Sequence, residues 1–265
     1  MPELPEVETA RRLAARVLAG RRIVGVATVD DPIVYAGVTP RRLAAALRGR
    51  RVTSVGRKGK HLWLELDRRP WPAFHFGMSG SFRVYGEEAE RPRYWKLELR
   101  TGDGVRLALR DPRRLGRIRL RRDPAGEPPI SGLGFDVLDE LPGAHELQAL
   151  LSRRKAPIKA VLLDQGLFAG VGNWIADEVL FQARISPHRP GASLDPSEVA
   201  RLRRQLGAIV GRAVEVLARQ QEFPRGWLFH RRWGRDGSAR TLRAERIVHE
   251  TIGGRTAAWV PSRQR

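Results

Sequence analysis

The hydrophobic residues of this 265-residue chain follow two different periods, and the change between them limits what it can fold into. In the first half, leucines alternate with other residues over 62–67, 96–100 and 105–110, which is typical of half-buried strands. A turn sequence at 101–104 joins the last two runs. These runs predict an antiparallel β-sandwich or flattened barrel, with a helix at its front.

Residues 123–134 are rich in proline and glycine, which indicates a hinge. After this segment the hydrophobic residues recur with a helical period. A capping box of Asp195 and Glu198 opens the longest expected helix. Helices are expected at 39–47 with Thr39 as cap, 155–164, Asn173–Ala183 and 195–219. The sequence therefore predicts an α+β fold with four parts. They are an N-terminal β-sandwich domain with a leading helix, a hinge, a helical domain and a closing hairpin, at 1–125, 126–140, 141–222 and 223–265.

The N-terminus combines a candidate nucleophile with acidic residues. If Met1 is removed, Pro2 becomes a free secondary amine followed directly by the carboxylate of Glu3. An α-amino group titrates at roughly 7.7–8.0, so part of it is unprotonated near neutrality and can attack an electrophilic carbon. Pro5 and Glu6 suit the first turn of a helix, so an ordinary helix entry explains the same residues. The field at a helix start favours ionised Glu3, which conflicts with a role as general acid.

Composition favours a polyanion as partner. The net charge is +20 and the pI about 11.5, with arginines spread through the whole chain. A solvated face or a basic proteome is the alternative explanation of the charge. The absence of cysteine excludes disulfides and thiolate metal sites, and the 6 histidines lack metal-ligand spacing. No apolar run predicts a membrane span or a signal core, so we expect a cytoplasmic, nucleoid-associated protein.

Three further segments carry residue types that can contact phosphate. Residues 56–61 are expected to form a basic turn before a strand. This turn contacts either phosphate or only solvent. Residues 75–80 place His75 and Met78 among glycines, either for close backbone approach or for loop packing. Gly170 and Gly172 let backbone N–H groups converge, and Asn173 is expected to cap the next helix. A plain helix–turn–helix with a glycine corner is the alternative there.

Taken together, these segments resemble the formamidopyrimidine-DNA glycosylase family. Its members begin Pro-Glu-Leu-Pro-Glu-Val-Glu-Thr, as residues 2–9 do here. Residues 75–80 resemble the family's His-Leu-Gly-Met-Ser-Gly motif, and 158–178 its helix-two-turns-helix motif. Residues 252–261 resemble the tip of the finger that closes most bacterial members, and 223–231 the corresponding stretch of plant and fungal members. The resemblance implies a cysteine-free, zincless finger with no metal and no cofactor, stabilised by Trp227, Phe229, Trp233 and Trp259.

The resemblance also implies residue roles. Pro2 is the nucleophile, Glu3 its acid/base partner and Glu6 a supporting carboxylate. Lys60, His75, Asn173 and Arg255 hold DNA phosphates, with Lys60 and Arg255 next to the lesion, and Lys159 lies near the damaged base. Met78, Arg113 and Leu115 fill the gap left by the everted base. Many bacterial members have phenylalanine where Leu115 stands, so the preference for the opposite base is in question.

The implied function is that of a monomeric, bifunctional DNA glycosylase/AP lyase acting on damaged double-stranded DNA. The segment before the finger is too short for the loop with which many bacterial members cap 8-oxoguanine. Formamidopyrimidines and hydantoins are therefore the expected lesions, with 8-oxoguanine as a further candidate. The alternatives are an endonuclease VIII-like enzyme for oxidised pyrimidines, a non-catalytic damage-binding protein and an RNA-binding protein.

Overall fold

A computed structural model describes residues 2–86, 88–234 and 237–265. The chain forms two compact units that divide between Gly132 and Leu133. This division lies within residues 126–140, whose role as a hinge remains a prediction. Both units combine helices with strands, which confirms the predicted α+β class.

The first unit contains two four-stranded sheets in which every neighbouring pair is antiparallel. The strand orders are β1-β6-β7-β5 and β2-β3-β4-β8. The strands are β1 (Ile23–Thr28), β2 (Val52–Lys58), β3 (His61–Leu66), β4 (Trp71–His75), β5 (Ser81–Tyr85), β6 (Trp95–Thr101), β7 (Arg106–Arg110) and β8 (Arg117–Arg121). The sandwich predicted from the alternating leucines is thus confirmed, since their side chains fill the core of this unit.

Two helices accompany these sheets. Helix α1 (Leu4–Leu18) contacts β2 and β3 of one sheet and β5 of the other, where it buries one face. Helix α2 (Pro40–Leu47) begins as expected, because the Thr39 hydroxyl accepts a hydrogen bond from the backbone N–H of Arg42 at 3.2 Å. The leading helix therefore belongs to the core of the unit and holds the N-terminal residues against it.

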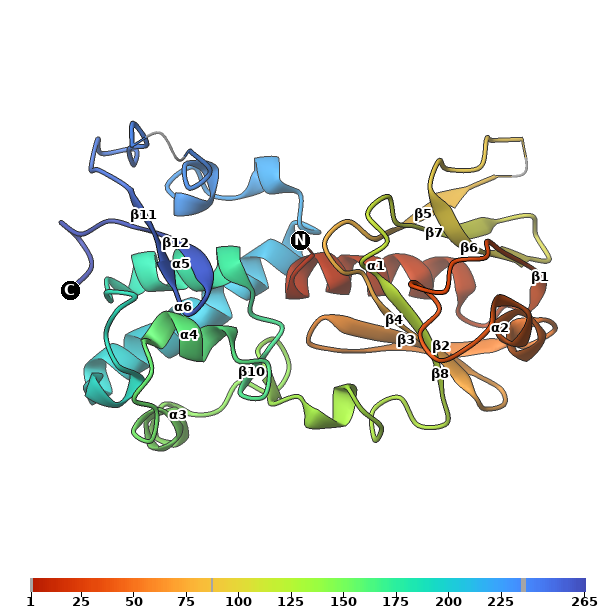
Figure 1. Ribbon diagram of the computed structural model, residues 1–265, viewed down its shortest axis with the longest axis horizontal. Coiled ribbons are helices and arrows are strands. Elements are labelled where there is room, and N and C mark those ends of the chain that lie inside the picture. The colour runs from red at the N-terminus through yellow and green to blue at the C-terminus, as the bar shows by residue number, and fades with distance from the viewer. Residues whose placement is uncertain (1, 87, 235–236) are drawn as a thin grey trace. The chain divides into compact units, whose positions relative to one another are not determined.

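The second unit is built around α5 (Asn173–Ala183), which is buried along almost its whole length and contacts α4, α6, η4 and β12 (Figure 1). Its α-helices besides α5 are α3 (Ala144–Leu151), α4 (Ile158–Leu163) and α6 (Pro196–Glu215). Its strands are the parallel pair β9 (Phe135–Asp136) and β10 (Phe168–Ala169), and the hairpin β11 (Val248–Ile252) and β12 (Arg255–Trp259). The 3₁₀ helices of the chain are η1 (Ile130–Gly132), η2 (Gly191–Ser193), η3 (Gln220–Glu222) and η4 (Leu228–His230).

Two of the expected helices are shorter than the periodicity indicates. Helix α4 starts at Ile158 because the ring of Pro157 disfavours a helical backbone at the preceding Ala156, and Pro157 itself stands outside the helix as its cap residue. Helix α6 has the predicted capping box of Asp195 and Glu198, but it ends at Glu215. Leu217 beyond this end adopts a positive φ of 53°, which stops the helix before residue 219.

The closing module is held by aromatic packing on α5. The rings of Trp174 and Phe223 lie 5.5 Å apart, those of Phe223 and Phe229 5.0 Å, and those of Trp174 and Trp227 6.3 Å. Trp227 and Phe229 were expected in this role. Trp259 packs elsewhere, against His188 at 5.3 Å, because its strand β12 lies on another side of α5. No helix in the described ranges has the length and apolarity needed to cross a bilayer.

Candidate functional site

The start of α1 carries an acidic pair, in which Glu3 is buried and Glu6 is partly buried. Glu3 is the cap residue of the helix, and its backbone N–H donates to Glu6 Oε2 at 2.9 Å within a reciprocal capping box. Only 2% of Glu3 is exposed. Because the backbone of Glu3 is extended, with φ −109° and ψ −170°, Pro2 lies outside the helix, directly before Glu3 in the chain.

The burial of this pair changes its titration. Burial of the Glu6 carboxyl, and secondly the negative charge of Glu3, raises the pKa of Glu6 to about 7. Glu8, one turn further, behaves in the opposite way. Burial alone would raise its pKa, but hydrogen bonds from Arg11 and Arg12 lower the pKa of Glu8 to about 2. A transferable proton near neutrality is therefore carried by Glu6. Met1 lies outside the described residues, and while it is attached the Pro2 nitrogen is an amide.

Lys60 and His75 come together through the register of β2, β3 and β4. Gly59, with a φ of 55°, and Lys60 form the two-residue turn between β2 and β3, since Lys58 pairs with His61. His61 pairs with His75 across β3 and β4, and their rings lie 4.7 Å apart. The structure thus brings the predicted phosphate ligands Lys60 and His75 to the same end of one sheet.

His75 is held in a defined, neutral form. Burial, followed by the positive charge of Lys60, lowers the pKa of His75 to about 4. Its Nδ1 accepts a hydrogen bond from the backbone N–H of Gly77 at 3.2 Å. In a neutral imidazole this places the proton on Nε2, which leaves Nε2–H as a donor for an acceptor such as phosphate.

The three predicted gap-filling residues lie on two loops that touch backbone to backbone. A Cβ on Gly77 would lie 2.3 Å from the Leu115 carbonyl oxygen, so the loop of Met78 can approach the loop of Leu115 only through a glycine. Met78 is 45% exposed and Leu115 39%, and Arg113 is exposed as well. The Ser79 hydroxyl donates to Asp111 Oδ1 at 2.8 Å and accepts from the Arg113 N–H at 3.3 Å, which joins the two loops.

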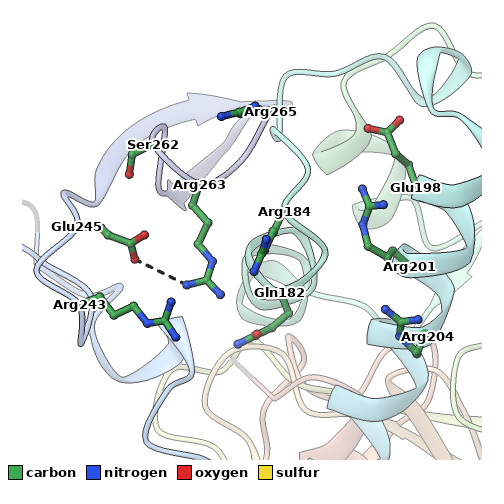
Figure 2. A pocket seen from close by; sticks show the side chains of 10 residues that line it. All are labelled: Gln182, Arg184, Glu198, Arg201, Arg204, Arg243, Glu245, Ser262, Arg263 and Arg265. Atoms are coloured by element: carbon green, nitrogen blue, oxygen red, sulfur yellow. Dashed lines mark ion pairs between the residues drawn. The ribbon is translucent and has the colours of Figure 1, made fainter.

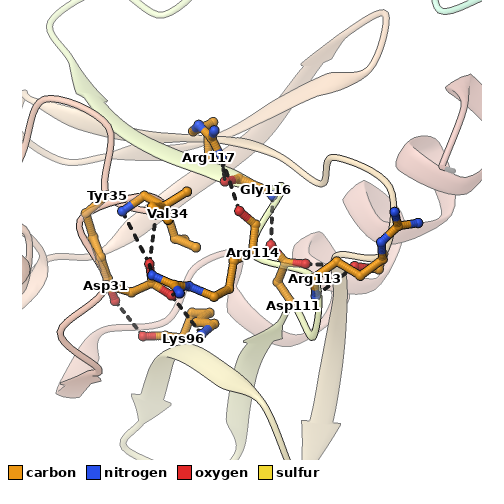
Figure 3. A network of polar contacts seen from close by, with 11 residues as sticks. Asp31, Val34, Tyr35, Lys96, Asp111, Arg113, Arg114, Gly116 and Arg117 are labelled. Carbon is orange, nitrogen blue, oxygen red and sulfur yellow. Dashed lines mark hydrogen bonds and ion pairs between the residues drawn. The ribbon is translucent and has the colours of Figure 1, made fainter.

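Arg114 anchors the second of these loops to the sheet. Its backbone has a φ of 56°, and its guanidinium donates to both carboxylate oxygens of Asp31, at 2.9 and 3.1 Å. Lys96 Nζ binds the same carboxylate at 2.8 Å, and Figure 3 shows Arg113 pointing away from Arg114. Burial alone would raise the pKa of Asp31, but hydrogen bonds from Arg114 and Lys96 lower it to about 2. Asp31 and Arg114 are 83 positions apart, and no sequence signal pointed to this anchor.

In the second unit, the corner before α5 differs in one detail from expectation. The cap residue of α5 is Gly172, and Asn173 is the first helical residue, so the predicted capping role of Asn173 is wrong. Glycine at the cap leaves the first N–H groups of the helix without a side-chain acceptor from that position. Asn173 Oδ1 is buried and makes no hydrogen bond with any residue in the described part of the chain.

Lys159 lies in a buried ionic cluster with Asp177 and Arg232. Its Nζ binds Asp177 Oδ1 and donates to the Thr256 carbonyl at 3.0 Å, and none of its side chain is exposed. Asp177 Oδ2 accepts from Arg232 Nη2 at 2.5 Å and from the Ala258 N–H at 3.1 Å. The cluster therefore fixes strand β12 on α4 and α5. The role of Lys159 beside a damaged base remains a prediction.

Arg255 is exposed at the start of β12, after a tight turn of Gly253 and Gly254, which have positive φ values of 58° and 73°. A Cβ on Gly253 would lie 2.6 Å from the Cβ of Ala160 in α4. The hairpin tip thus packs directly on α4. Among the residues that the structure describes, no group of three or more His, Asp or Glu side chains is arranged to bind a metal ion.

Comparison with known proteins identifies the family. Residues 1–118 match the model of the formamidopyrimidine-DNA glycosylase N-terminal domain, and residues 133–223 match the model of the formamidopyrimidine-DNA glycosylase H2TH domain. The chain is 40% identical to a formamidopyrimidine-DNA glycosylase of Arabidopsis thaliana, over 100% of this chain and 71% of that protein. It is 36% identical to the enzyme of Stenotrophomonas maltophilia over the full length of both. The chain belongs to the formamidopyrimidine-DNA glycosylase family of DNA repair enzymes.

Solved structures agree with this assignment. The chain is similar to Lactococcus lactis formamidopyrimidine-DNA glycosylase in complex with DNA containing FAPY-dG, with 25% identity, a TM-score of 0.85, and coverage of 99% of this chain and 100% of that one. A complex of the same bacterial enzyme with DNA containing an oxidised pyrimidine gives 25% identity, full coverage of both chains and a TM-score of 0.86. This family member is bound to damaged DNA in both solved structures, in agreement with the DNA binding that the sequence predicts.

Proposed function

We propose that this protein is a bifunctional DNA glycosylase/AP lyase that uses Pro2 as its nucleophile. The observation that carries the proposal is the acidic pair of Glu3 and Glu6 at the start of α1, directly after Pro2 in the chain. It supplies a carboxyl group, Glu6, whose pKa of about 7 lets it both give and take a proton near neutrality. This also resolves the conflict in the sequence between an ionised Glu3 and a general acid, because the two carboxyl groups can divide these tasks.

The proposed reaction begins after Met1 is removed. The lone pair of the Pro2 nitrogen forms a bond to C1′ of the deoxyribose while the bond from C1′ to the base breaks, and the base leaves with that electron pair and takes up the proton that the Pro2 nitrogen releases. The nitrogen lone pair then forms a double bond to C1′ as the C1′–O4′ bond opens, with a proton delivered to O4′ from the acidic pair, which leaves a positively charged iminium (Schiff base). The iminium accepts electrons when a proton leaves C2′, so the bond from C3′ to its phosphate oxygen breaks. Loss of a second proton, from C4′, then breaks the bond from C5′ to its phosphate oxygen. These β- and δ-eliminations cut the strand on both sides of the lesion.

The remaining predicted residues bind the DNA in this proposal. Lys60 and His75 hold phosphate near the lesion, which the Nε2–H donor of a neutral His75 supports. Asn173 and Arg255 hold further phosphates and carry little sequence information. Met78, Arg113 and Leu115 occupy the space of the flipped nucleotide, as their exposure on two joined loops supports. Lys159 differs from these three, because its buried cluster supports a structural role.

The proposed substrates are ring-opened formamidopyrimidines and hydantoins, with 8-oxoguanine as a further candidate. The structure of the Lactococcus lactis enzyme with oxidised-pyrimidine DNA supports a second candidate, the excision of oxidised pyrimidines. Cleavage of matched duplexes that differ only in the lesion distinguishes the two, by the ratio of their kcat/KM values.

Trapping with borohydride tests the proposal. Borohydride reduces an iminium to a stable amine, so the Met1-free enzyme should become covalently attached to a duplex containing an oxidised base. Peptide mapping should locate the adduct on Pro2. Absence of an adduct from a protein shown by mass spectrometry to lack Met1, on every lesion of the panel, would reject the mechanism. Binding without strand cleavage would indicate the damage-binding alternative.

A further inference from the structure

A pocket of about 860 Å³ lies within the second unit, at the C-terminal end of α5 (Figure 2). It is bordered by α6, by residues 243–245 and by the last residues of the chain. Six of its ten lining side chains are arginines, and Figure 2 shows those of α6 across the opening from those of the other segments. They are Arg184, Arg201, Arg204, Arg243, Arg263 and Arg265.

The two acidic residues of the pocket are already engaged. Glu198 accepts two hydrogen bonds at 3.1 Å from Arg189, which does not line the pocket. Glu245 accepts from the Thr241 hydroxyl at 2.8 Å and lies 3.8 Å from the Arg263 guanidinium. The lining therefore has a positive excess that its own carboxylates do not balance.

Most of these arginines have no internal function. Within residues 2–86, 88–234 and 237–265, the side chains of Arg184, Arg204, Arg243 and Arg265 make no hydrogen bond and no ion pair. Arg263 stacks its guanidinium on Phe181 at 4.6 Å, and its buried Nε has no partner in the same ranges. Unpaired like charges repel one another, so their convergence on one pocket contributes nothing to stability unless an anion enters it.

We propose that this pocket binds the phosphodiester backbone of a DNA segment other than the one that carries the lesion. The guanidinium is a planar fork of donors that fits phosphate oxygens in pairs. A single phosphate would leave most of a pocket of about 860 Å³ empty, whereas a chain of consecutive phosphates extends through it. The lining contains no aromatic side chain, so it offers bases no surface for stacking and selects the backbone alone.

The hydrogen-bonding character favours nucleic acid over an acidic peptide. An arginine side chain donates but cannot accept, and a DNA backbone accepts but cannot donate. A peptide would bring one N–H donor with almost every residue. Apart from Gln182 and Ser262, the lining side chains offer as acceptors only two carboxylates that are already bonded. The pocket also lies apart from Asn173, at the other end of α5, which is about 16 Å away along an eleven-residue helix.

The proposal is independent of the chemistry at Pro2 and is tested by DNA binding. The test variant is the triple substitution Arg184→Gln, Arg204→Gln and Arg243→Gln. The control variant removes the same number of positive charges from exposed arginines in α2 and just after its end. Its substitutions are Arg41→Gln, Arg42→Gln and Arg48→Gln. Affinity for an undamaged duplex is measured by fluorescence anisotropy over a range of salt concentrations, and the thermal unfolding midpoint verifies folding. The single variant Arg204→Glu, on the exposed face of α6, replaces the triple variant if that one does not fold.

We expect the slope of log affinity against log salt to fall by about 2 to 3 in the pocket variant, at about 0.9 for each phosphate that is no longer neutralised, and by less in the control. Two short duplexes with different fluorophores should give energy transfer on wild-type protein and none on the pocket variant. Equal slopes for the pocket variant and the control would overturn the proposal. A lowered slope in the pocket variant, with no energy transfer on the wild-type protein, would also overturn it, because a single duplex would then contact both the pocket and the site for the lesion. Displacement of the second duplex by tripolyphosphate but not by polyglutamate supports the phosphate assignment, and the reverse order overturns it in favour of an acidic protein partner.

Discussion

Two buried groups of charged side chains, one in each unit, differ in how their charges are balanced. In the second unit, the carboxylate of Asp177 lies between the cations of Lys159 and Arg232, and a backbone N–H satisfies it further. At the start of α1, Glu3 and Glu6 carry the same sign of charge, and no cationic side chain among the described residues is bonded to Glu6. Asp177 lowers the cost of its burial by pairing, and Glu6 by holding a proton.

This difference in charge balance distinguishes a structural role from a reactive one. A compensated cluster has no easy change of charge, so it serves to fix chain segments relative to one another. A like-charged pair keeps one carboxyl protonated near pH 7 and is therefore able to exchange a proton with a substrate. Each group can be altered without the other, and the largest effect is expected at the N-terminus.

Retention of Met1 should remove the reaction that the acidic pair serves. An amide nitrogen at Pro2 has no available lone pair, so strand cleavage should fall on the order of 10⁴- to 10⁶-fold, as when a covalent nucleophile is removed. Pro2→Gly, with Met1 removed, retains a weaker primary amine and should still form some borohydride adduct. Equal cleavage rates for the Met1-retaining and the processed chain would show that the nucleophile lies elsewhere.

Glu6→Gln should remove the proton while keeping the hydrogen bond acceptor for Glu3 N–H. We expect single-turnover cleavage to fall by about 10²- to 10⁴-fold, and the decline of the wild-type rate above pH 7 to disappear. Stability should also change with pH. The folded protein keeps the Glu6 proton up to about pH 7, whereas the unfolded chain releases it near 4.5. The free energy of unfolding should thus decrease by up to about 3 kcal/mol between these values in wild type, but not in the variant.

Asp177→Ala should unfold the second unit more easily, because Lys159 and Arg232 would remain buried without their counter-charge. We expect a decrease of about 3 to 5 kcal/mol in the free energy of unfolding, measured by urea denaturation. The matched control is Asp103→Ala, which breaks an exposed ion pair with Arg21 at 3.3 Å and should cost much less stability, because solvent screens that pair. Similar decreases for the two variants would mean that the cluster is not a structural anchor.

Asp31→Asn tests a third, compensated group, the anchor of the loop that carries Arg113 and Leu115. The substitution keeps the shape of the side chain but removes the charge that holds Arg114 and Lys96. We expect a decrease of about tenfold in kcat, with KM almost unchanged, and a weaker preference for the base opposite the lesion. The control is Asp30→Asn at the exposed neighbouring position. If only thermal stability decreased, with the base preference intact, Asp31 would have no positioning role.

How far the sequence predicts this molecule depends on how local each signal is. The alternation of leucines over 62–67 and the Thr39 cap act over a few residues, and both are confirmed. The end of α6 was missed because apolar periodicity continues past Glu215, while the backbone at Leu217 turns to positive φ. The N-terminal residue types could be read directly. The raised pKa of Glu6 could not, since it depends on how deeply the folded chain buries that carboxyl group.

The contacts that hold the residues of the candidate site in place could not be predicted from the sequence either, because they join positions far apart in the chain. Asp31 meets Arg114 across 83 positions, and Lys159 meets Thr256 across 97. Neither pair has a motif of its own, because such a contact requires only that the fold bring two groups together. Lys159 was recognised by its resemblance to a family position, and the structure adds a partner, Asp177, that the sequence did not indicate.

The contact of Gly253 with Ala160 has a consequence for a finger without a metal. A hairpin fastened at one place can pivot about it, whereas one fastened at two places cannot. The strand β12 is fastened through Thr256 and Ala258, its second and fourth residues, and the turn before it rests on α4 at Gly253. This attachment at the strand and at the turn sets the direction in which Arg255 projects. In a zinc finger, the coordination geometry of the metal would set that direction.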